Sequence, residues 1–303
     1  MPLRCGVLFS QSKPGPADTA HGVELRLLVR CSARGTGRAS RVVLPLVLAS
    51  ALSGCGSRED LIIGVENFTP QKRDDFDGAE LDASYWELAS HTFEPNLAWF
   101  SPANAKVDHG MLVLSITADP SPANPMPNDV IKPYSAAEVR TRVSFLYGRF
   151  RARVRFAPGI GVVSAFWGFY DRYAASSGPQ LDNQIVIESG IGKASEEPEL
   201  RYTVQVPTGG PKPSEHPTDF DPAAGFHIVG YDWTPTEVRF FLDGESQLVV
   251  SGDAAAQLTQ YQRLVMSAYP SKPDWLGTFD PAELPITAEL DWIEISDYRG
   301  ARP

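Results

Sequence analysis

Cysteine is scarce in this chain of 303 residues: only three occur, and none follows Cys55. The long C-terminal part therefore cannot contain a disulfide bond. The five histidines are scattered, without the spacing of a metal site; they are His21, His91, His109, His216 and His227. Helical periodicity is also scarce, so no long helix is expected. What remains is a domain held by a hydrophobic core, for which 43% hydrophobic residues are sufficient.

Basic residues are few outside the first 54 residues. That segment contains seven Lys or Arg and two Asp or Glu, and subtracting them from the whole chain's 27 and 37 leaves 20 basic and 35 acidic residues. The remainder therefore has a formal net charge of −15, compared with −10 for the whole chain. A domain this acidic is a poor partner for nucleic acid and other anionic polymers. We expect a neutral ligand.

The first 54 residues resemble an export signal. Basic residues precede an apolar run, residues 42–51, that is too short to span a bilayer. The next residues, Leu52-Ser53-Gly54-Cys55, resemble the lipobox of bacterial lipoproteins. That resemblance implies lipidation of Cys55, export, a membrane anchor in the cell envelope or at the cell surface, and a tether over residues 55–70. The alternative is a plain signal peptide with an unrelated cysteine. The leader is longer than needed, which suggests a start downstream of Met1.

Short alternating runs bounded by Gly, Pro and Asp predict an all-β protein. Ten segments have this pattern: 111–117, 138–143, 148–156, 162–170, 184–188, 200–206, 227–233, 238–242, 263–269 and 286–295. No internal repeat and no second domain are evident. The pattern predicts a sandwich of two antiparallel sheets.

Four segments, in this order, together resemble glycoside hydrolase family 16, especially its lichenase and laminarinase types. They are "DDFDGAELDASYW" (74–86), "YSAAEVRTRVSFLYGRFRARVRFAPGIGVVSAFWGFY" (134–170), "FDPAAGFHIVGYDWTPTEVRFFLDG" (220–244) and "DWLGTFDPAELPITAELDWIEI" (274–295). The resemblance implies a concanavalin A-like β-jelly roll over residues 71–299. It also implies a monomer that acts on, or binds, a neutral β-glucan or galactan.

The catalytic signature of that family is E-x-D-x-E on one strand: nucleophile, assisting aspartate and acid/base. The segment "LDNQIVIESG" (181–190) stands at its place, with Gln184, Val186 and Glu188 at the three positions. Retaining hydrolysis needs two carboxyl groups about 5–5.5 Å apart. A glutamine amide is a poor nucleophile, and valine cannot tune neighbouring charges. The sequence therefore predicts glycan binding, as a pseudoenzyme, over standard retaining hydrolysis.

The resemblance also implies substrate-binding residues. They are Asn96, Glu138, Arg140, Tyr269 and Trp275. Sugars stack on aromatic rings and form hydrogen bonds with carboxylates, amides and arginines. As alternatives, Glu138 and Arg140 form a structural pair, and the two aromatic residues belong to the core or the rim.

Members of the family often hold a structural calcium ion, for which Asp291 is the matching residue. One carboxylate is a weak indication of a calcium site, and the chemistry itself requires no cofactor.

Three other functions stay open. The first is an active hydrolase or transglycosylase with Glu188 as acid/base and another attacking group, such as a loop carboxylate at Asp274 or Glu94 or a directly activated water. The second is a lyase, because "AEVR" and "QIV" faintly resemble motifs of polysaccharide lyase family 7; Ala136 and Val186 stand where that family has an arginine and a histidine. The third is a structural envelope protein.

Overall fold

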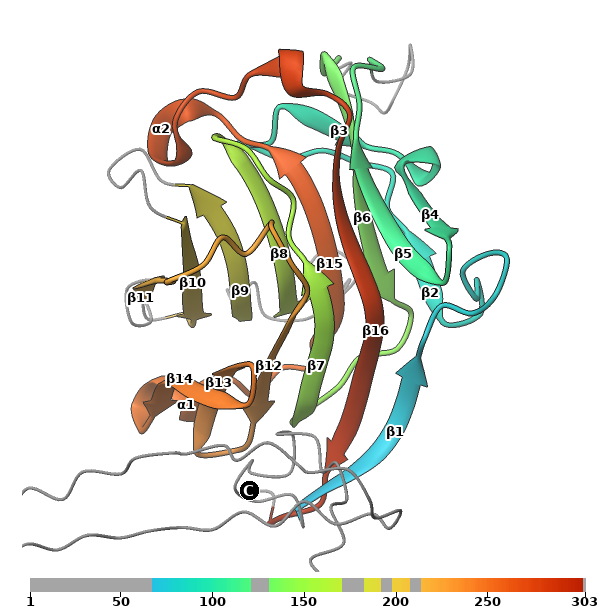
Figure 1. Cartoon of the computed structure of the whole chain (residues 1–303). Helices are drawn as coiled ribbons and strands as arrows, with labels where there is room; N and C mark the ends of the chain where they lie inside the picture. The colour runs from blue at the N-terminus through green and yellow to red at the C-terminus, as the bar shows by residue number, and fades with distance from the viewer. Residues whose placement is uncertain (1–66, 121–130, 171–182, 192–197, 208–213, 302–303) are drawn as a thin grey trace, which may run out of the picture. The chain divides into compact units, whose positions relative to one another are not determined.

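Two stacked β-sheets form the framework of the described chain, which covers residues 67–120, 131–170, 183–191, 198–207 and 214–301 of the computed structural model. These residues belong to one unit, Gly54–Pro303. Figure 1 shows the sheets as two layers. The predicted all-β sandwich is thereby confirmed.

The first sheet has eight strands in the order β14-β13-β12-β7-β16-β5-β4, with β1 paired to β16. Their bounds are β1 Phe68–Asp74, β4 Ala105–Asp108, β5 Met111–Ile116, β7 Gly148–Arg155, β12 His227–Trp233, β13 Glu237–Leu242, β14 Glu245–Ser251 and β16 Ile286–Tyr298.

The second sheet also has eight strands, in the order β11-β10-β9-β8-β15-β6-β2, with β3 pairing in parallel with β6. Their bounds are β2 Trp86–Leu88, β3 Ala98–Phe100, β6 Tyr134–Thr141, β8 Val162–Phe169, β9 Gln184–Ile191, β10 Pro198–Gln205, β11 Ser214–Pro217 and β15 Arg263–Pro270. The helices are single turns: α1 Asp253–Ala256, α2 Pro273–Leu276, and 3-10 turns at Pro102–Asn104 and Pro281–Glu283.

All ten predicted strands are present, and six further strands, β1, β2, β3, β4, β11 and β14, were not predicted. Because β1 begins at Phe68, the last residues of the predicted tether are part of the first sheet. Strand β1 pairs with the C-terminal half of β16, and this long-range pairing extends the sheet beyond what the local pattern indicates.

Alternation along the strands separates the core from the outward faces. In β9, Ile185 and Ile187 are fully buried between the sheets, while Gln184, Val186 and Glu188 are half-buried on the opposite side. We call the outward face of the second sheet, which carries these three residues, the site face.

The outward face of the first sheet carries a ladder of ion pairs along β7. Each arginine that points outward from β7 meets a carboxylate on β12 or β16: Arg149–Asp232, Arg151–Glu294, Arg153–Asp291 and Arg155–Glu289, each at 2.6 Å. Asp291, the predicted calcium ligand, is thus already paired. No cluster of three or more potential metal ligands occurs among the described residues, so a calcium site stays a prediction. None of the described helices has the length and apolar character to cross a membrane.

Candidate active site

Glu188 lies in a row of residues that crosses five strands of the site face. Strand register places Glu188 directly opposite Arg201 of β10 on one side and Ala165 of β8 on the other. Ala165 is opposite Ser267 of β15, which is opposite Glu138 of β6. Two glutamates therefore flank two small residues, with about 14 Å between their backbones. The small side chains leave the space between the carboxylates unfilled by protein side chains from this row.

The carboxyl group of Glu188 is shielded but unpaired. Among the described residues, it accepts no hydrogen bond and forms no ion pair. Loss of hydration raises its pKa from 4.5 to about 7; the positive charge of Arg201 opposes this rise and the negative charge of Glu199 adds to it. Such a carboxyl group holds its proton near neutral pH and can donate it to a leaving group, as a general acid must.

The raised pKa of Glu188 predicts a pH-dependent effect on stability. In the unfolded chain this group ionises near pH 4.5, and in the folded protein near 7, so folding becomes less favourable as pH rises between these values. The variant Glu188→Gln has no titrating group at this position, so its stability does not decrease for this reason as pH rises. We expect its free energy of unfolding, relative to the parent protein, to increase by about 2–3 kcal/mol from pH 4.5 to pH 7.5.

Urea unfolding at several pH values measures this difference. Glu245→Gln is the matched control, because Glu245 is exposed on β14 of the other sheet. Its stability should follow that of the parent protein across the range. Parallel curves for Glu188→Gln and the parent would show that Glu188 titrates normally.

The two other signature positions contribute no charge to the site face. Val186 is opposite Thr203 of β10 and Trp167 of β8. Gln184 is opposite Gln205 and Phe169 in the same way. The three signature positions are thus brought together on one face, as the sequence predicts, but only Glu188 is a carboxylic acid.

A small apolar cluster covers part of the site face, separate from the main core. It contains Val163 and Ala165 of β8 and Leu276 of α2, with Trp167 and Tyr269 packed against it. Leu276 lies over Gly190 of β9, where a Cβ atom would come within 2.8 Å of its Cδ2 atom. A larger residue at position 190 would therefore require the Leu276 side chain to shift.

Tyr269 and Trp167 give the site face an aromatic surface. The ring of Tyr269 lies 5.4 Å from that of exposed Phe93 and 5.7 Å from that of buried Phe100, both edge-on. The rings of Trp167 and Phe169 are 5.0 Å apart. Burial raises the pKa of Tyr269, and the negative charges of Glu188 and Glu138 raise it further. The hydroxyl group of Tyr269 therefore stays protonated.

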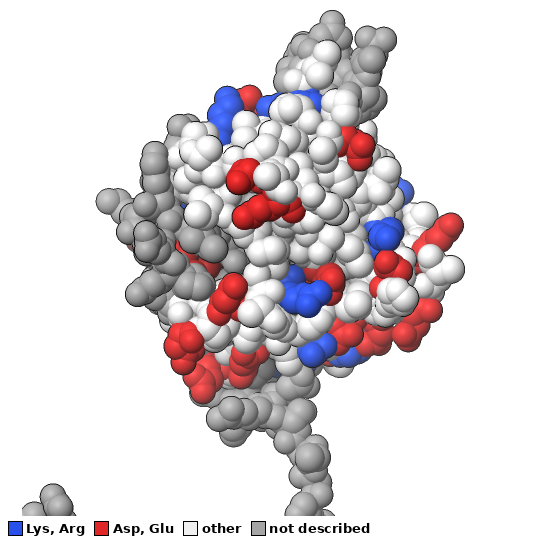
Figure 2. Space-filling view, turned by 45° about the horizontal axis from the view of Figure 1, so that its top comes forward, with Lys and Arg blue, Asp and Glu red and all other residues white. Residues whose placement is uncertain are grey.

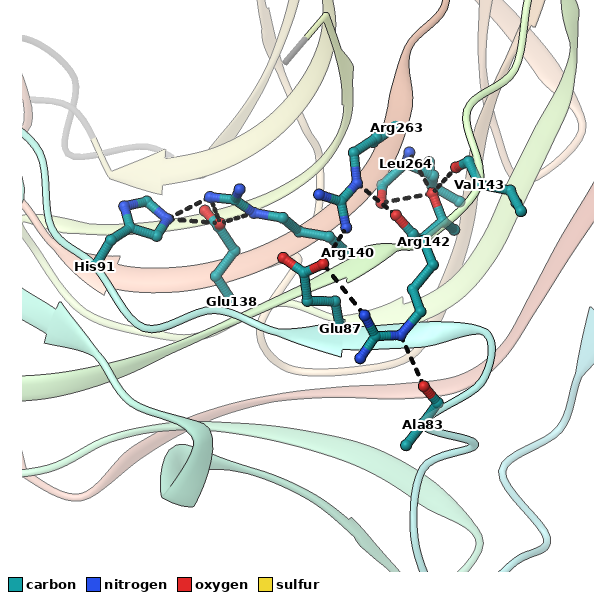
Figure 3. Close-up of polar contacts among 10 residues, drawn as sticks. Ala83, Glu87, His91, Glu138, Arg140, Arg142, Val143, Arg263 and Leu264 are labelled. Atoms are coloured by element: carbon teal, nitrogen blue, oxygen red, sulfur yellow. Dashed lines mark hydrogen bonds and ion pairs between the residues drawn. The ribbon is translucent and has the colours of Figure 1, made fainter. Parts of the chain in front are cut away.

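Glu138 is held by two neighbours at the far end of the row. Its Oε1 atom accepts a hydrogen bond of 2.5 Å from Arg140 Nε and lies 3.1 Å from His91 Nε2, which also contacts the Arg140 guanidinium (Figure 3). Only 1% of the Glu138 side chain is exposed. The predicted Glu138–Arg140 pair therefore exists, and its arginine neutralises the carboxylate.

The remaining described carboxylates near the site face are also paired. Glu87 contacts Arg263 at 3.0 Å and Arg142 at 3.6 Å (Figure 3). Glu199 contacts Arg201 at 2.5 Å. Of the four carboxylates on this face whose side chains the structure describes, Glu188 alone has no cationic partner within 4 Å. It is therefore the one best suited to exchange a proton with a ligand.

Glu94, which the sequence left open as a substitute nucleophile, lies on an exposed loop. It forms ion pairs with Lys132 and Lys272, and hydrogen bonds from these lysines lower its pKa. A carboxylate committed to two lysines is a weak candidate for attack on a sugar.

The remaining predicted site residues are either buried or have side chains that lie outside the described residues. Asn96 is fully buried, and its Oδ1 atom accepts a hydrogen bond from the Ala98 backbone, which orders its own loop; sugar contact by Asn96 stays a prediction. The backbones of Asp274 and Trp275 are in α2, but their side chains lie outside the described residues, as does Cys55. Sugar contact by Trp275 and lipidation of Cys55 therefore stay predictions.

Three comparisons with known proteins bear on this site. The family model described as Glycosyl hydrolases family 16 matches residues 94–294. A β-glucanase of Fibrobacter succinogenes is 29% identical over 171 residues, which cover 55% of this chain and 48% of that protein. A β-glucanase of Acetivibrio thermocellus is 26% identical over 224 residues, which cover 71% and 60%. The chain thus spans about half to three fifths of the length of these curated relatives.

A solved structure extends the likeness to three dimensions. The crystal structure of a prokaryotic β-1,3-1,4-glucanase (lichenase) from a mouse hindgut metagenome has a TM-score of 0.62 and 26% identity. The match covers 76% of this chain and 100% of that chain. The predicted jelly-roll sandwich is therefore confirmed by comparison as well as by strand order.

Proposed function

Because this chain belongs to glycosyl hydrolases family 16, with the family model matching two thirds of its length, we propose that it hydrolyses a β-glucan with Glu188 as the general acid. One observation carries the proposal: among the carboxylic acids of the site face whose side chains are described, Glu188 is the one without a cationic partner, and its pKa is raised to about 7. A carboxyl group shielded from water and free of a cation is the usual proton donor in glycoside hydrolysis.

A β-glucan is the substrate class that the surroundings of Glu188 favour. The relatives described above are named β-glucanases. The exposed ring of Phe93 beside Tyr269, and the half-buried rings of Trp167 and Phe169, suit stacking against pyranose rings. Figure 2 shows one face of the molecule, on which the described residues form no broad basic area of the kind that would attract an anionic polymer.

In the proposed reaction, Glu188 donates its proton to the glycosidic oxygen while the bond from that oxygen to the anomeric carbon breaks. The anomeric carbon gains a bond to the oxygen of a water molecule or of a second carboxylate, and in the latter case water later releases the sugar. Neither Gln184 nor Val186 can supply this carboxylate. The attacking group is not assigned; Asp274, in α2, is the candidate to replace first.

Glu188→Gln tests the proposal. We expect reducing-end release from mixed-linkage β-glucan or laminarin to fall by about 10²–10⁴-fold, because a glutamine cannot donate the proton. In the parent protein kcat/KM should fall as pH rises through about 7, where Glu188 loses its proton. Glu245→Gln serves again as the control and should retain activity. Release that persists in Glu188→Gln would rule out Glu188 as the acid.

Glycan binding without turnover is the second candidate, and the absence of a carboxylate at Gln184 and Val186 favours it. It predicts no reducing-end release by the parent protein from mixed-linkage β-glucan, laminarin or agarose. It also predicts retarded migration of the parent protein in gels that contain one of these polysaccharides. Retardation without release would replace the hydrolase proposal by this one.

A further inference from the structure

His91 joins the Glu138–Arg140 pair at the end of the row opposite Glu188. It lies in the segment between β2 and β3 and pairs with Phe100 of β3 in an isolated bridge. Its Nε2 atom lies 3.1 Å from Glu138 Oε1 and also contacts the Arg140 guanidinium (Figure 3). The exposed fraction of the side chain is 35% for His91, 13% for Arg140 and 1% for Glu138. A ligand at this end of the site face therefore has more access to His91 than to either charged side chain.

The contacts of Nε2 determine which nitrogen of the His91 ring carries the proton. A guanidinium donates hydrogen bonds and cannot accept one, so Nε2 must be an acceptor where it meets Arg140. Glu138 accepts a hydrogen bond of 2.5 Å from Arg140 Nε and needs no proton from the histidine. A neutral imidazole whose Nε2 atom is an acceptor carries its proton on Nδ1. The Nδ1 atom of His91 is therefore a hydrogen-bond donor.

This donor is accessible and its direction is fixed. Figure 3 shows Nδ1 on the side of the ring that faces away from Glu138 and Arg140. It forms no hydrogen bond with a described residue, and it is not one of the buried polar atoms that lack a partner. The ring packs edge-on against Phe100 with the ring centres 5.3 Å apart, so packing and polar contacts together hold its orientation. An oriented donor without a protein partner is suited to an acceptor atom of a ligand.

An exposed aromatic ring lies beside this donor. Phe93 is 36% exposed, its ring centre is 6.4 Å from that of His91, and the two ring planes differ by 31°. Tyr269 of the site face supports Phe93 edge-on at 5.4 Å. A pyranose ring offers C–H groups that pack on an aromatic ring and hydroxyl groups that accept hydrogen bonds. The combination of Phe93 with the His91 donor thus fits a neutral sugar.

We propose that His91 is a specificity-determining residue, which donates a hydrogen bond from Nδ1 to a sugar hydroxyl group while the sugar ring packs on Phe93. Glu138 and Arg140 are positioning residues, which hold the imidazole and fix its tautomer. The backbones of Glu138 and Glu188 are about 14 Å apart, so the contacted sugar lies away from the bond that Glu188 would protonate. The choice of a β-glucan as ligand rests on the proposed function, but the hydrogen bond can be tested without turnover.

The tautomer of His91 is the first test. In protein labelled with ¹⁵N at histidine, two-dimensional NMR shows which ring nitrogen carries the proton. The signals of His91 are identified by their absence in His91→Asn. We expect the proton on Nδ1 at about pH 9, where imidazole rings are ordinarily neutral. A proton on Nε2, or on both nitrogens, would overturn the proposal, because Nε2 could then not accept a hydrogen bond from Arg140.

Two substitutions separate contact with a sugar from a purely structural role. The amide nitrogen of His91→Asn can take the place of Nδ1, whereas that of His91→Gln, one methylene further out, can take the place of Nε2. We expect His91→Gln to bind mixed-linkage β-glucan about 3–10-fold more weakly than the parent, the effect of one lost hydrogen bond, and His91→Asn to bind with an affinity close to that of the parent. Affinity gel electrophoresis measures this, with Glu188→Gln as the common background so that the polysaccharide stays intact.

His109→Asn is the matched control, because His109 lies on the turn between β4 and β5 of the other sheet with 89% of its side chain exposed. Its affinity should equal that of the parent. Weaker binding by His91→Asn than by His91→Gln, or equal affinities of these two variants, would overturn the proposal. Absence of any retardation of the background protein would overturn it as well.

These measurements do not depend on sugar release, so their failure is distinct from failure of Glu188 as the acid. If the protein does release sugar, KM should rise in His91→Gln while kcat stays at its parent value. A contact away from the cleaved bond stabilises the bound substrate and the transition state equally, which produces this division. A lower kcat with unchanged KM would contradict the assigned role.

Discussion

Introducing two carboxylates, Gln184→Glu together with Val186→Asp, is expected to raise turnover of mixed-linkage β-glucan by about 10³-fold or more. Losing a nucleophile costs other hydrolases on the order of 10⁶ in turnover, so restoring one should recover a large part of that factor. Both positions are half-buried on the site face, on the same strand as Glu188. Residues i and i+4 of a strand share a face, so the new carboxylate at position 184 would point toward the acid.

Reducing-end release at low enzyme concentration measures this gain. Val186→Asp alone is the control, because it restores the assisting charge without a nucleophile and should give little increase. A product of retained configuration, detected by NMR before mutarotation, would assign the attack to the carboxylate at position 184. A folded double variant without a gain would show that other parts of the site have also changed.

Removing the buried arginine of the first sheet is expected to cause the largest loss of stability. Arg149 donates two hydrogen bonds to Asp232, of 2.6 and 2.7 Å, and the side chains are 5% and 6% exposed. Its guanidinium also lies 4.4 Å from the centre of the Phe68 ring. Burial already raises the pKa of Asp232, although Arg149 opposes this rise. Arg149→Met would leave that carboxylate buried without its partner, at a cost of about 3–5 kcal/mol.

Urea unfolding at neutral pH measures this loss. Arg153→Met is the matched control on the same strand: Arg153 pairs with Asp291 at the same 2.6 Å, but their side chains are 40% and 38% exposed. An exposed pair contributes about 0–1 kcal/mol, so this variant should be nearly as stable as the parent. Equal losses in the two variants would mean that burial does not set the strength of these pairs.

The fold could be predicted because its main strands alternate clearly between apolar and polar residues. Strands β2 and β3 contain three residues each and are defined by pairing with β6, so no local pattern indicates them. The row that joins Glu188 to Glu138 could not be predicted either. It depends on the register of five strands, and a register is fixed by long-range packing.

The site was predicted in part for the same reason. The resemblance to family 16 pointed to Glu188 and to the pair of Glu138 and Arg140. His91 was missed because it follows β2 in an irregular segment that reaches Glu138 only in the folded chain. Arg201 and Glu199 left a signal that was overlooked: in "ELRYTV" (199–204) charged or polar residues alternate with fully buried ones. A charged outward face beside the strand of Glu188 indicates a functional neighbourhood.

The pairing of β1 with β16 determines how the domain would respond to mechanical force. Phe68 at the start of β1 is opposite Tyr298 near the end of β16, and their rings are 5.7 Å apart. Both ends of the described chain therefore leave from one end of an antiparallel pair. Tension applied to them would open this pair one hydrogen bond at a time, instead of shearing all of its bonds together. The first sheet would lose β1 early, while the site face, carried by the other sheet, would not lie in the line of force.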